Sequence, residues 1–403
     1  MENQQRKNSI LCISFWTPPI VRPQSILIGK MIPEWVRQGV KPIIITYREK
    51  EKWQIDLPIY KVDKFQLNRY LRRLPLIANL LEKRYFYRLF KQMEEIVKKH
   101  QINLIYSFSN PYASNIVGAK LKEKLGIKFI SNFSDPWYDD PYQSFSKSEK
   151  KDIARKEKNI IQTSNRIIFN NEVAKNLVMK KYPVEWQKKA IVIPHCFDSK
   201  KYPAKLEKKK DYFILSHIGA FYQQRNPELL FSALRSVLAK EPSLKKKLRL
   251  RLVGGDLKYT NYQTKDLLSV ISNFGLDEIA EILPAVSYQE SLEEMKLADC
   301  LIVIDADFNL SPFFPSKVVD YAGSQTPIIG ITPNNSPTAQ LLRGLGCPSF
   351  NYQQENNLTG YLIKLISGQV EIKINHDYLQ NFSVENTTKS LIKIFNEILT
   401  EKL

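Results

Sequence analysis

Residues 314–323 read Phe-Pro-Ser-Lys-Val-Val-Asp-Tyr-Ala-Gly, and residues 326–331 read Thr-Pro-Ile-Ile-Gly-Ile. Pro315 is typical of the first turn of a helix, where a missing N–H costs nothing. Gly323 stands where that helix would end, and the later apolar run indicates a buried strand. An apolar run of strand length, 300–305, precedes the segment. This order of strand, loop, helix and strand predicts one unit of a doubly wound α/β sheet.

The amino end of the predicted helix would face the loop after a parallel strand. Such an end offers free N–H groups and a positive dipole, which suit a phosphate group. Ser316 and Lys317 stand at this end, and Asp320 follows one turn later on the same side. A carboxylate there could accept both hydroxyls of a ribose. An ordinary crossover helix with a solvated Asp320 fits the local sequence equally well.

Composition bounds the class of protein. A chain of 403 residues suggests two or three domains, and 43% hydrophobic with 25% charged residues is typical of a globular protein. No apolar run approaches the ~20 residues of a membrane span, and the first residues lack a signal-peptide core. The four cysteines and four histidines are scattered without metal or disulfide spacing. We therefore expect a cytoplasmic protein with no metal site and no cofactor.

The net charge of +19 is compatible with nucleic acid, an anionic membrane surface or an anionic substrate as partner. The sequence is rich in Lys, Ile and Asn throughout, so a compositional bias of the genome would explain the charge as well. No recognisable nucleic-acid module is visible, and we expect no nucleic-acid partner. Charge alone does not choose between the remaining partners.

Strand-like and helix-length segments alternate along the chain, which predicts parallel sheets covered on both faces. The predicted strands lie at 10–15, 42–47, 59–62, 104–108, 129–133, 167–170, 191–194, 213–219, 248–253, 282–286, 300–305, 328–331 and 348–350. A helical region crowded with Arg, Lys and aromatic residues is predicted from about 67 to 100.

A polar, Lys-rich stretch at 198–211 interrupts the alternation and predicts a linker. It would separate a first domain, 1–197, from a second domain, 212–383. An amphipathic segment at 384–403 predicts a last helix that packs back on the first domain. The predicted fold class is α/β, with two Rossmann-like doubly wound domains facing a cleft.

Ligands of doubly wound sheets bind beyond the carboxyl ends of the strands, so the residues of those loops are candidates. Gly219 permits close backbone approach, and Arg225 stands before a helix that Asn226 could cap, where a guanidinium could hold a diphosphate. A surface Arg at a helix start is the alternative. Asp135 ends another strand, and a turn before proline would also explain it. His217, within a predicted strand, is expected to be structural.

The order of these motifs resembles that of the retaining glycosyltransferases of family 4, which have the two-domain GT-B fold. The resemblance covers nearly the whole chain. Its motifs are the Pro-Pro loop after the first strand, Ser-Asp-Pro-Trp at 134–137, the segment Ile-Pro-His-Cys-Phe-Asp at 193–198, Gly219 to Pro227, Gly254-Gly255, 286–290 and Pro315 to Tyr321.

The resemblance implies transfer of a sugar from a UDP- or GDP-linked donor to a polysaccharide or lipid-linked glycan precursor, without a metal. The residues implied to bind the donor are Gly219, Arg225, Val286, Ser316, Lys317 and Asp320, with Asp320 on the ribose and Val286 beside the base. The residues implied on the acceptor side are Pro19, Arg22, Asp135 and Trp137. Catalytic roles are implied for Asp135, Arg225 and Lys317, the two cations stabilising the leaving group.

The chain departs from the family pattern in several places. The first acid of the family's acid pair, expected near Ser311, is absent, and Asp320 replaces the more usual Glu. The opening loop has Arg22 where a Gly-Gly pair is common, and His195 with Cys196 replaces an Asn-Gly pair. Two alternatives therefore stay open: a GT-B-fold epimerase of nucleotide sugars, and a non-catalytic protein that binds polyanions. The Arg- and Tyr-rich region around 67–88 is expected to rest peripherally on anionic lipid at the inner face of the membrane.

Overall fold

The computed structural model describes residues 9–20, 22–49, 53–66, 70, 74–204, 206, 212–221, 224–255 and 264–401. The chain divides into two compact units. The first unit consists of Met1–Pro194 with Thr387–Leu403, and the second of His195–Asn386. We describe each unit by itself.

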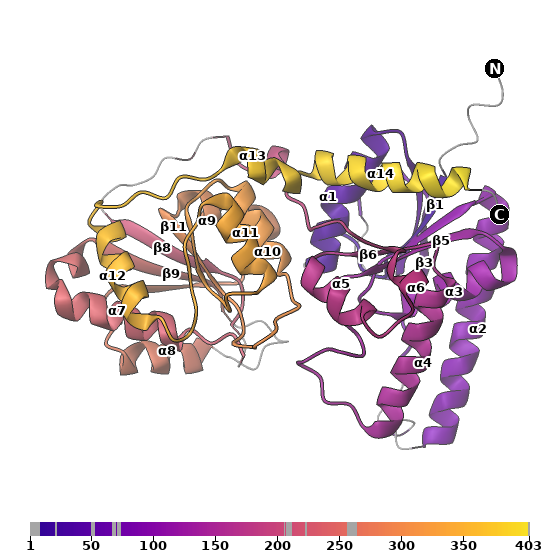
Figure 1. Cartoon of the computed structure of the whole chain (residues 1–403), viewed down its shortest axis with the longest axis horizontal. Helices are drawn as coiled ribbons and strands as arrows, with labels where there is room; N and C mark the ends of the chain where they lie inside the picture. The colour runs from indigo at the N-terminus through magenta and orange to yellow at the C-terminus, as the bar shows by residue number, and fades with distance from the viewer. Residues whose placement is uncertain are drawn as a thin grey trace. The chain divides into compact units, whose positions relative to one another are not determined.

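The first unit is built on a seven-stranded sheet in which all neighbouring strands are parallel. The strand order is β3-β2-β1-β4-β5-β6-β7, and helices cover the sheet (Figure 1). Its strands are β1 (Ser9–Ile13), β2 (Lys41–Tyr47), β3 (Ile59–Val62), β4 (Leu104–Ser107), β5 (Lys128–Phe133), β6 (Arg166–Phe169) and β7 (Ala190–Val192). Its helices are α1 (Pro23–Arg37), α2 (Pro75–His100), α3 (Ala113–Leu125), α4 (Lys147–Thr163), α5 (Glu172–Met179) and α6 (Val184–Gln187), joined by α14 (Val384–Thr400).

Helix α14 completes the core of the first unit although it comes last in the chain. Its buried face repeats at helical spacing through Leu391, Ile394, Phe395 and Ile398. The Phe395 ring meets the fully buried Trp35 ring edge-on, with centroids 5.2 Å apart. Aromatic pairs of this kind add to the free energy of burial. The amphipathic pattern at the end of the sequence therefore predicts this helix correctly.

The second unit has a six-stranded parallel sheet of order β10-β9-β8-β11-β12-β13. Its strands are β8 (Phe213–Ile218), β9 (Leu248–Gly255), β10 (Ala280–Pro284), β11 (Cys300–Ile304), β12 (Ile328–Ile331) and β13 (Ser349–Phe350). Its helices are α7 (Glu228–Lys240), α8 (Thr264–Asn273), α9 (Tyr288–Leu297), α10 (Ser316–Gly323), α11 (Pro337–Leu345), α12 (Glu355–Ile366) and α13 (His376–Leu379), with short 3₁₀ turns η2 (Ser199–Lys201), η3 (Pro242–Lys246) and η4 (Gln380–Phe382). This is the strand order of a Rossmann sheet, reversing between β8 and β11.

The structure confirms the predicted α/β class with two Rossmann-like units. Several predicted elements differ in their bounds by a few residues, and two examples show how. The strand expected at 282–286 is β10 and ends at Pro284, two residues early. The helix expected from about 67 begins at Pro75, while 67–69 and 71–73 lie outside the described residues. Of the predicted linker, 205 and 207–211 also lie outside them.

Two segments at one end of the second unit run side by side. The Phe197 N–H donates to the Phe382 carbonyl at 3.0 Å, and the Val384 N–H donates to the Phe197 carbonyl at 2.8 Å. The chain thus enters and leaves this unit through paired backbone segments, before and after residues 195–386. Among the helices that the structure describes, none combines the length and apolar character needed to cross a membrane.

Candidate functional site

The loop after β11 places the amino end of α10 at the carboxyl edge of the second sheet. Ser316 is the first helical residue, and Pro315 is extended and directly precedes it. The sequence had predicted Pro315 within the first turn, so the helix begins one residue later than expected. The first turn of α10 carries no acidic residue. The core face of the helix is anchored by Val318, Val319 and Tyr321, which are fully buried. The Val318 N–H donates to the Pro315 carbonyl at 3.0 Å, so the N–H groups of Ser316 and Lys317 are the ones that this helix start offers to an anion.

Gly219 and Lys317 come together directly after β8. Gly219 has φ +122°, a conformation that side chains rarely adopt, and a Cβ built on it would lie 3.2 Å from Lys317 Nζ. Gly254, with φ +115°, packs its backbone on Gly219, since its own Cβ would lie 3.1 Å from the Gly219 carbonyl carbon. The two glycines thus leave the ammonium lying against bare backbone at the carboxyl ends of two neighbouring strands.

The surroundings of Lys317 disfavour its charged form. Burial, and then the nearby Arg225 guanidinium, lower its pKa to about 7, although the carboxylate of Asp305 opposes the shift. Asp305 is buried at the end of β11 and accepts a hydrogen bond from Thr332 Oγ1 at 2.8 Å. A ligand that brought negative charge here would relieve the repulsion between the two cations.

His217 is a contact of Lys317 that the sequence did not predict. Its Nε2 lies 3.2 Å from Lys317 Nζ, and its Nδ1 lies 3.0 Å from the Ile302 carbonyl. Its ring stacks on Phe221 with centroids 4.4 Å apart. Position within a strand suggested a purely structural residue, and no sequence signal marks the Lys317 contact, because the two residues are a hundred positions apart.

Asp320 lies deeper in the unit than its predicted ribose role required. It is 3% exposed, and its Oδ1 accepts a hydrogen bond from the Tyr288 hydroxyl at 3.1 Å. The Tyr202 hydroxyl donates to the Asp320 carbonyl at 2.8 Å, which fixes the helix backbone. Burial and the Asp320 charge raise the pKa of Tyr288 far above its usual range, so Tyr288 stays a donor. A ribose would share the carboxylate with this tyrosine.

Two further predicted donor residues lie in the same unit. Arg225 stands in the loop before α7 and is partly exposed, and Asn226 Oδ1 accepts from the Glu228 N–H at 3.1 Å as the helix begins. Val286 lies in the turn between β10 and α9 and packs against the core of the unit. That turn ends in a capping box, in which the Ser287 hydroxyl accepts from the Glu290 N–H.

In the first unit, the predicted acceptor-side residues Asp135 and Trp137 lie in one loop after β5. Asp135 Oδ2 accepts a hydrogen bond from Asn110 Nδ2 at 3.3 Å. The Trp137 ring stacks on Tyr112 with centroids 4.3 Å apart and planes 4° from parallel. Asn110 and Tyr112 follow β4, the neighbouring strand, so the rule that the carboxyl ends of parallel strands meet at one edge could have found them.

The loop after β1 holds the other two predicted acceptor-side residues. Pro19 is exposed, and the Arg22 guanidinium lies over the Trp16 ring, 4.0 Å from its centroid. Gln24 Nε2 donates to Ser14 Oγ at 2.9 Å and ties the start of α1 to the end of β1. These contacts fix the loop after β1, and they hold the Arg22 guanidinium on the face of the Trp16 ring.

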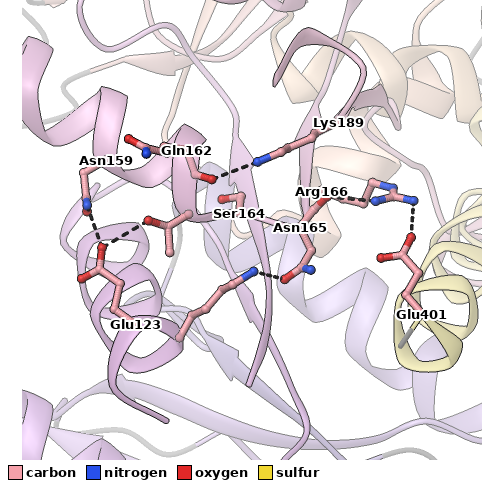
Figure 2. Close-up of a pocket in the computed structure, with 10 residues that line it drawn as sticks. Glu123, Asn159, Gln162, Ser164, Asn165, Arg166, Lys189 and Glu401 are labelled. Carbon is pink, nitrogen blue, oxygen red and sulfur yellow. Dashed lines mark hydrogen bonds and ion pairs between the residues drawn. The ribbon is translucent and has the colours of Figure 1, made fainter. Parts of the chain in front are cut away.

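A polar pocket of about 580 Å³ lies at the opposite edge of the first sheet, between the ends of α3 and α4 and the starts of β6 and β7 (Figure 2). Lys122 Nζ donates to Asn165 Oδ1 at 2.5 Å, and Lys189 Nζ donates to the Gln162 carbonyl at 2.9 Å. Burial, together with Lys189 and Lys128, lowers the pKa of Lys122 to about 8. None of the predicted site residues lines this pocket, so it is separate from the loops that follow the strands.

Comparison with solved structures defines the class of the fold. A glycosyltransferase from Rickettsia africae is 15% identical, with a TM-score of 0.68 over 98% of this chain and 100% of that one. Anabaena HepE in complex with UDP and glucose is 13% identical, with a TM-score of 0.70 over 97% of this chain and 100% of that one. Sucrose-phosphate synthase from Thermosynechococcus elongatus is 13% identical, with a TM-score of 0.72 over 98% and 99%. The chain has the two-domain GT-B fold of these proteins.

Comparison of sequences gives a family match over less than half of the chain. Residues 25–201 match the model of Glycosyltransferase Family 4. D-inositol 3-phosphate glycosyltransferases from Saccharomonospora viridis and Kineococcus radiotolerans are 20% and 21% identical over 253 and 199 residues, or 60% and 47% of this chain. The alignments span 58% and 45% of those relatives. Residues 25–201 therefore resemble the glycosyltransferases of family 4, and the whole chain has the fold of the solved structures, as the order of the sequence motifs predicted.

Proposed function

We propose that the protein is a retaining glycosyltransferase that moves a sugar from a nucleoside-diphosphate sugar to a glycan or lipid-linked acceptor. The observation that carries the proposal is the placement of the Lys317 ammonium against Gly219 at the amino end of α10. A cation, a bare backbone and free N–H groups are what a diphosphate requires. Arg225, which acts electrostatically on the same lysine, adds a second positive charge.

The proposed chemistry uses these groups as the leaving-group site. As the acceptor hydroxyl oxygen bonds to the anomeric carbon on the face that the diphosphate leaves, the bond from that carbon to the diphosphate breaks. Negative charge grows on the departing oxygen, and the hydroxyl proton passes to that oxygen. Lys317, Arg225 and the helix end would stabilise that charge without a metal ion. Asp320 and Val286 would hold the ribose and the base. Asp135, with Trp137, would line the acceptor side of the first unit.

Calorimetric titration with UDP and with GDP tests the donor site. UDP is the first ligand to try, because HepE, which shares the fold, was crystallised with UDP. We expect wild type to bind one of the two nucleotides and Asp320→Asn to bind it about tenfold or more weakly, because the amide offers one acceptor oxygen in place of two. Asp377→Asn, an exposed position on α13, is the matched control. If wild type binds neither nucleotide, the assignment as a transferase is wrong.

We propose further that the acceptor is met at an anionic membrane surface, on which the amino-terminal half of α2 rests. Large apolar side chains are exposed there: Leu76 is 86% and Leu80 67% exposed. The same face continues into exposed Lys83, Arg84 and Arg88. The amino ends of α2 and α4 lie together at one end of the first unit (Figure 1), and α4 begins with exposed lysines. Apolar residues followed by cations on one helix face are typical of interfacial binding.

Vesicle sedimentation tests this surface. Wild type is expected to sediment with vesicles containing anionic lipid at low salt, and less at high salt because the attraction is screened. The double variant Leu76→Gln and Leu80→Gln should lose most of the bound fraction, since each buried apolar side chain contributes about 1.5 kcal/mol or more. Leu268→Gln, which removes a similarly exposed leucine from α8, should bind as wild type does. Equal binding by both variants would contradict the proposal.

A further inference from the structure

His217 has one hydrogen-bonding arrangement that its surroundings permit. It is 2% exposed on β8, and its Nδ1 faces the Ile302 carbonyl oxygen at 3.0 Å. A carbonyl oxygen can only accept a hydrogen bond, so Nδ1 must carry the ring proton. Nε2 is then left as an acceptor, and it lies 3.2 Å from Lys317 Nζ. The imidazole thus accepts a hydrogen bond from the lysine.

The surroundings of His217 on balance disfavour its charged form. Burial, Lys317 and Arg225 all lower the pKa of His217 well below its usual value of 6.5, and the hydrogen bond to Ile302 opposes them only in part. Stacking on Phe221, with planes 15° from parallel, fixes the plane of the ring. His217 therefore stays a neutral acceptor of fixed direction at physiological pH.

Lys317 is consequently held by a neutral group, and its charge is not cancelled. The charged groups acting on it are Arg225, which repels it, and Asp305, which attracts it. Asp305 Oδ2 accepts a hydrogen bond from Thr332, and its Oδ1 is buried without a hydrogen-bond partner among the residues that the structure describes. This carboxylate therefore acts on Lys317 through its charge. An ion pair would occupy the ammonium, whereas an imidazole acceptor directs it and leaves two of its N–H donors for a ligand.

We propose that His217 is a positioning residue of the diphosphate site, holding Lys317 against Gly219 through Nε2, so that a diphosphate binds together with a proton. This inference rests on the proposed donor site and adds to it a residue and a proton linkage. The proton is the one that completes the Lys317 ammonium. Burial and Arg225 lower the pKa of Lys317 to about 7, so the ligand-free protein holds this proton weakly near neutral pH. An anion beside Lys317 raises that pKa and draws the proton in.

The linkage predicts how binding varies with pH. At pH 8 most ligand-free molecules hold a neutral Lys317, so binding of UDP or inorganic pyrophosphate should take up close to one proton. At pH 5.5 Lys317 is already charged, and the uptake by this group should vanish. Affinity should rise as pH falls from 8.5 to 7, because the binding-competent form becomes more populated. Titration calorimetry in two buffers of different ionisation enthalpy measures the protons taken up.

Substitution of His217 separates positioning from packing. His217→Leu fills much of the space but has no acceptor, and we expect it to weaken UDP binding about tenfold, the equivalent of one hydrogen bond. It should also move the pH profile to lower pH, since the ammonium loses a stabilising partner. His217→Gln offers an amide oxygen and is expected to restore both affinity and profile to near wild type. In turnover assays the loss should appear in the donor KM more than in kcat.

Nitrogen NMR of labelled histidine tests the contact without any ligand. The His217 signal, assigned by its absence from His217→Leu, should report a neutral ring protonated at Nδ1 down to pH 5.5. Protonation near 6.5, or a proton on Nε2, would overturn the inference. So would wild-type affinity and proton uptake in His217→Leu. Failure of wild type to bind UDP, GDP and pyrophosphate would overturn the donor site and the proton linkage, and the NMR result would still decide the His217–Lys317 contact.

Discussion

Replacing Lys317 with methionine is expected to lower kcat/KM by about two to three orders of magnitude, the usual cost of removing one preorganised donor to developing negative charge. Methionine keeps the length of the aliphatic stem but cannot donate to a diphosphate. Steady-state kinetics and UDP calorimetry measure the loss. Lys364→Met, at an exposed position of α12 in the same unit, should leave both quantities unchanged.

Although Lys317→Met is expected to lose activity, it should not lose stability. The lysine has a pKa of about 7 in the folded protein against 10.5 ordinarily, so folding disfavours its charge. That cost is full below pH 7 and disappears above pH 10.5. The variant should therefore unfold at the same or a higher temperature than wild type at pH 6. An inactive variant that also unfolds early would indicate a structural role and contradict our reading of the site.

Replacing Glu157 with alanine is expected to destabilise the first unit by about 2 to 4 kcal/mol, because the Tyr138 N–H and the Tyr182 hydroxyl lose their buried acceptor while Lys181 keeps its ion pair with Asp139. Glu157 is fully buried on α4. Its carboxylate accepts hydrogen bonds from the Tyr138 N–H at 3.0 Å and the Tyr182 hydroxyl at 2.8 Å, and it pairs with Lys181 at 2.8 Å. Alanine would leave all three donors without this acceptor. Urea unfolding monitored by circular dichroism measures the change.

Two further substitutions serve as controls for the loss of stability in Glu157→Ala. Glu157→Gln keeps an oxygen for the Tyr138 N–H and should cost less than alanine. Asp152→Ala breaks ion pairs with Arg155 and Lys156 on the exposed part of the same helix, and should cost less than about 1 kcal/mol. Because Tyr138 adjoins the loop that carries Asp135, we expect Glu157→Ala also to loosen the proposed acceptor side. A loss no larger than that of Asp152→Ala would show that the buried network is not important for folding.

Much of the fold could be predicted from the sequence because its signals are local. Apolar runs such as 300–305 and 328–331 mark buried parallel strands, and Gly39, with φ +89°, follows α1 where the end of a helix was expected. The ends of elements were harder to predict where the apolar character of the sequence continues past the last strand residue, as it does after Pro284. The exact unit boundaries that the structure gives, 194/195 and 386/387, depend on contacts between distant segments.

The candidate site was predictable only in part, for the same reason. The loops after β8 and β5 and the start of α10 are visible as glycine, acid and helix-start signals, and these marked Gly219, Asp135 and Lys317. Their partners are not marked in this way. Tyr288 reaches Asp320 from α9, the helix that precedes α10 in the chain, and His217 reaches Lys317 from inside a strand. Such pairs become apparent only when the chain is folded.

The return of α14 to the first unit has a consequence for the order in which the protein can fold during synthesis. The ribosome completes residues 195–386, a whole unit, before it makes Phe395, which meets Trp35 and Tyr106 in the core of the first unit. The unit that is begun first is therefore finished last. Until then the Trp35 and Tyr106 rings lack their contact with Phe395, so this stage of synthesis exposes apolar surface that a chaperone could protect.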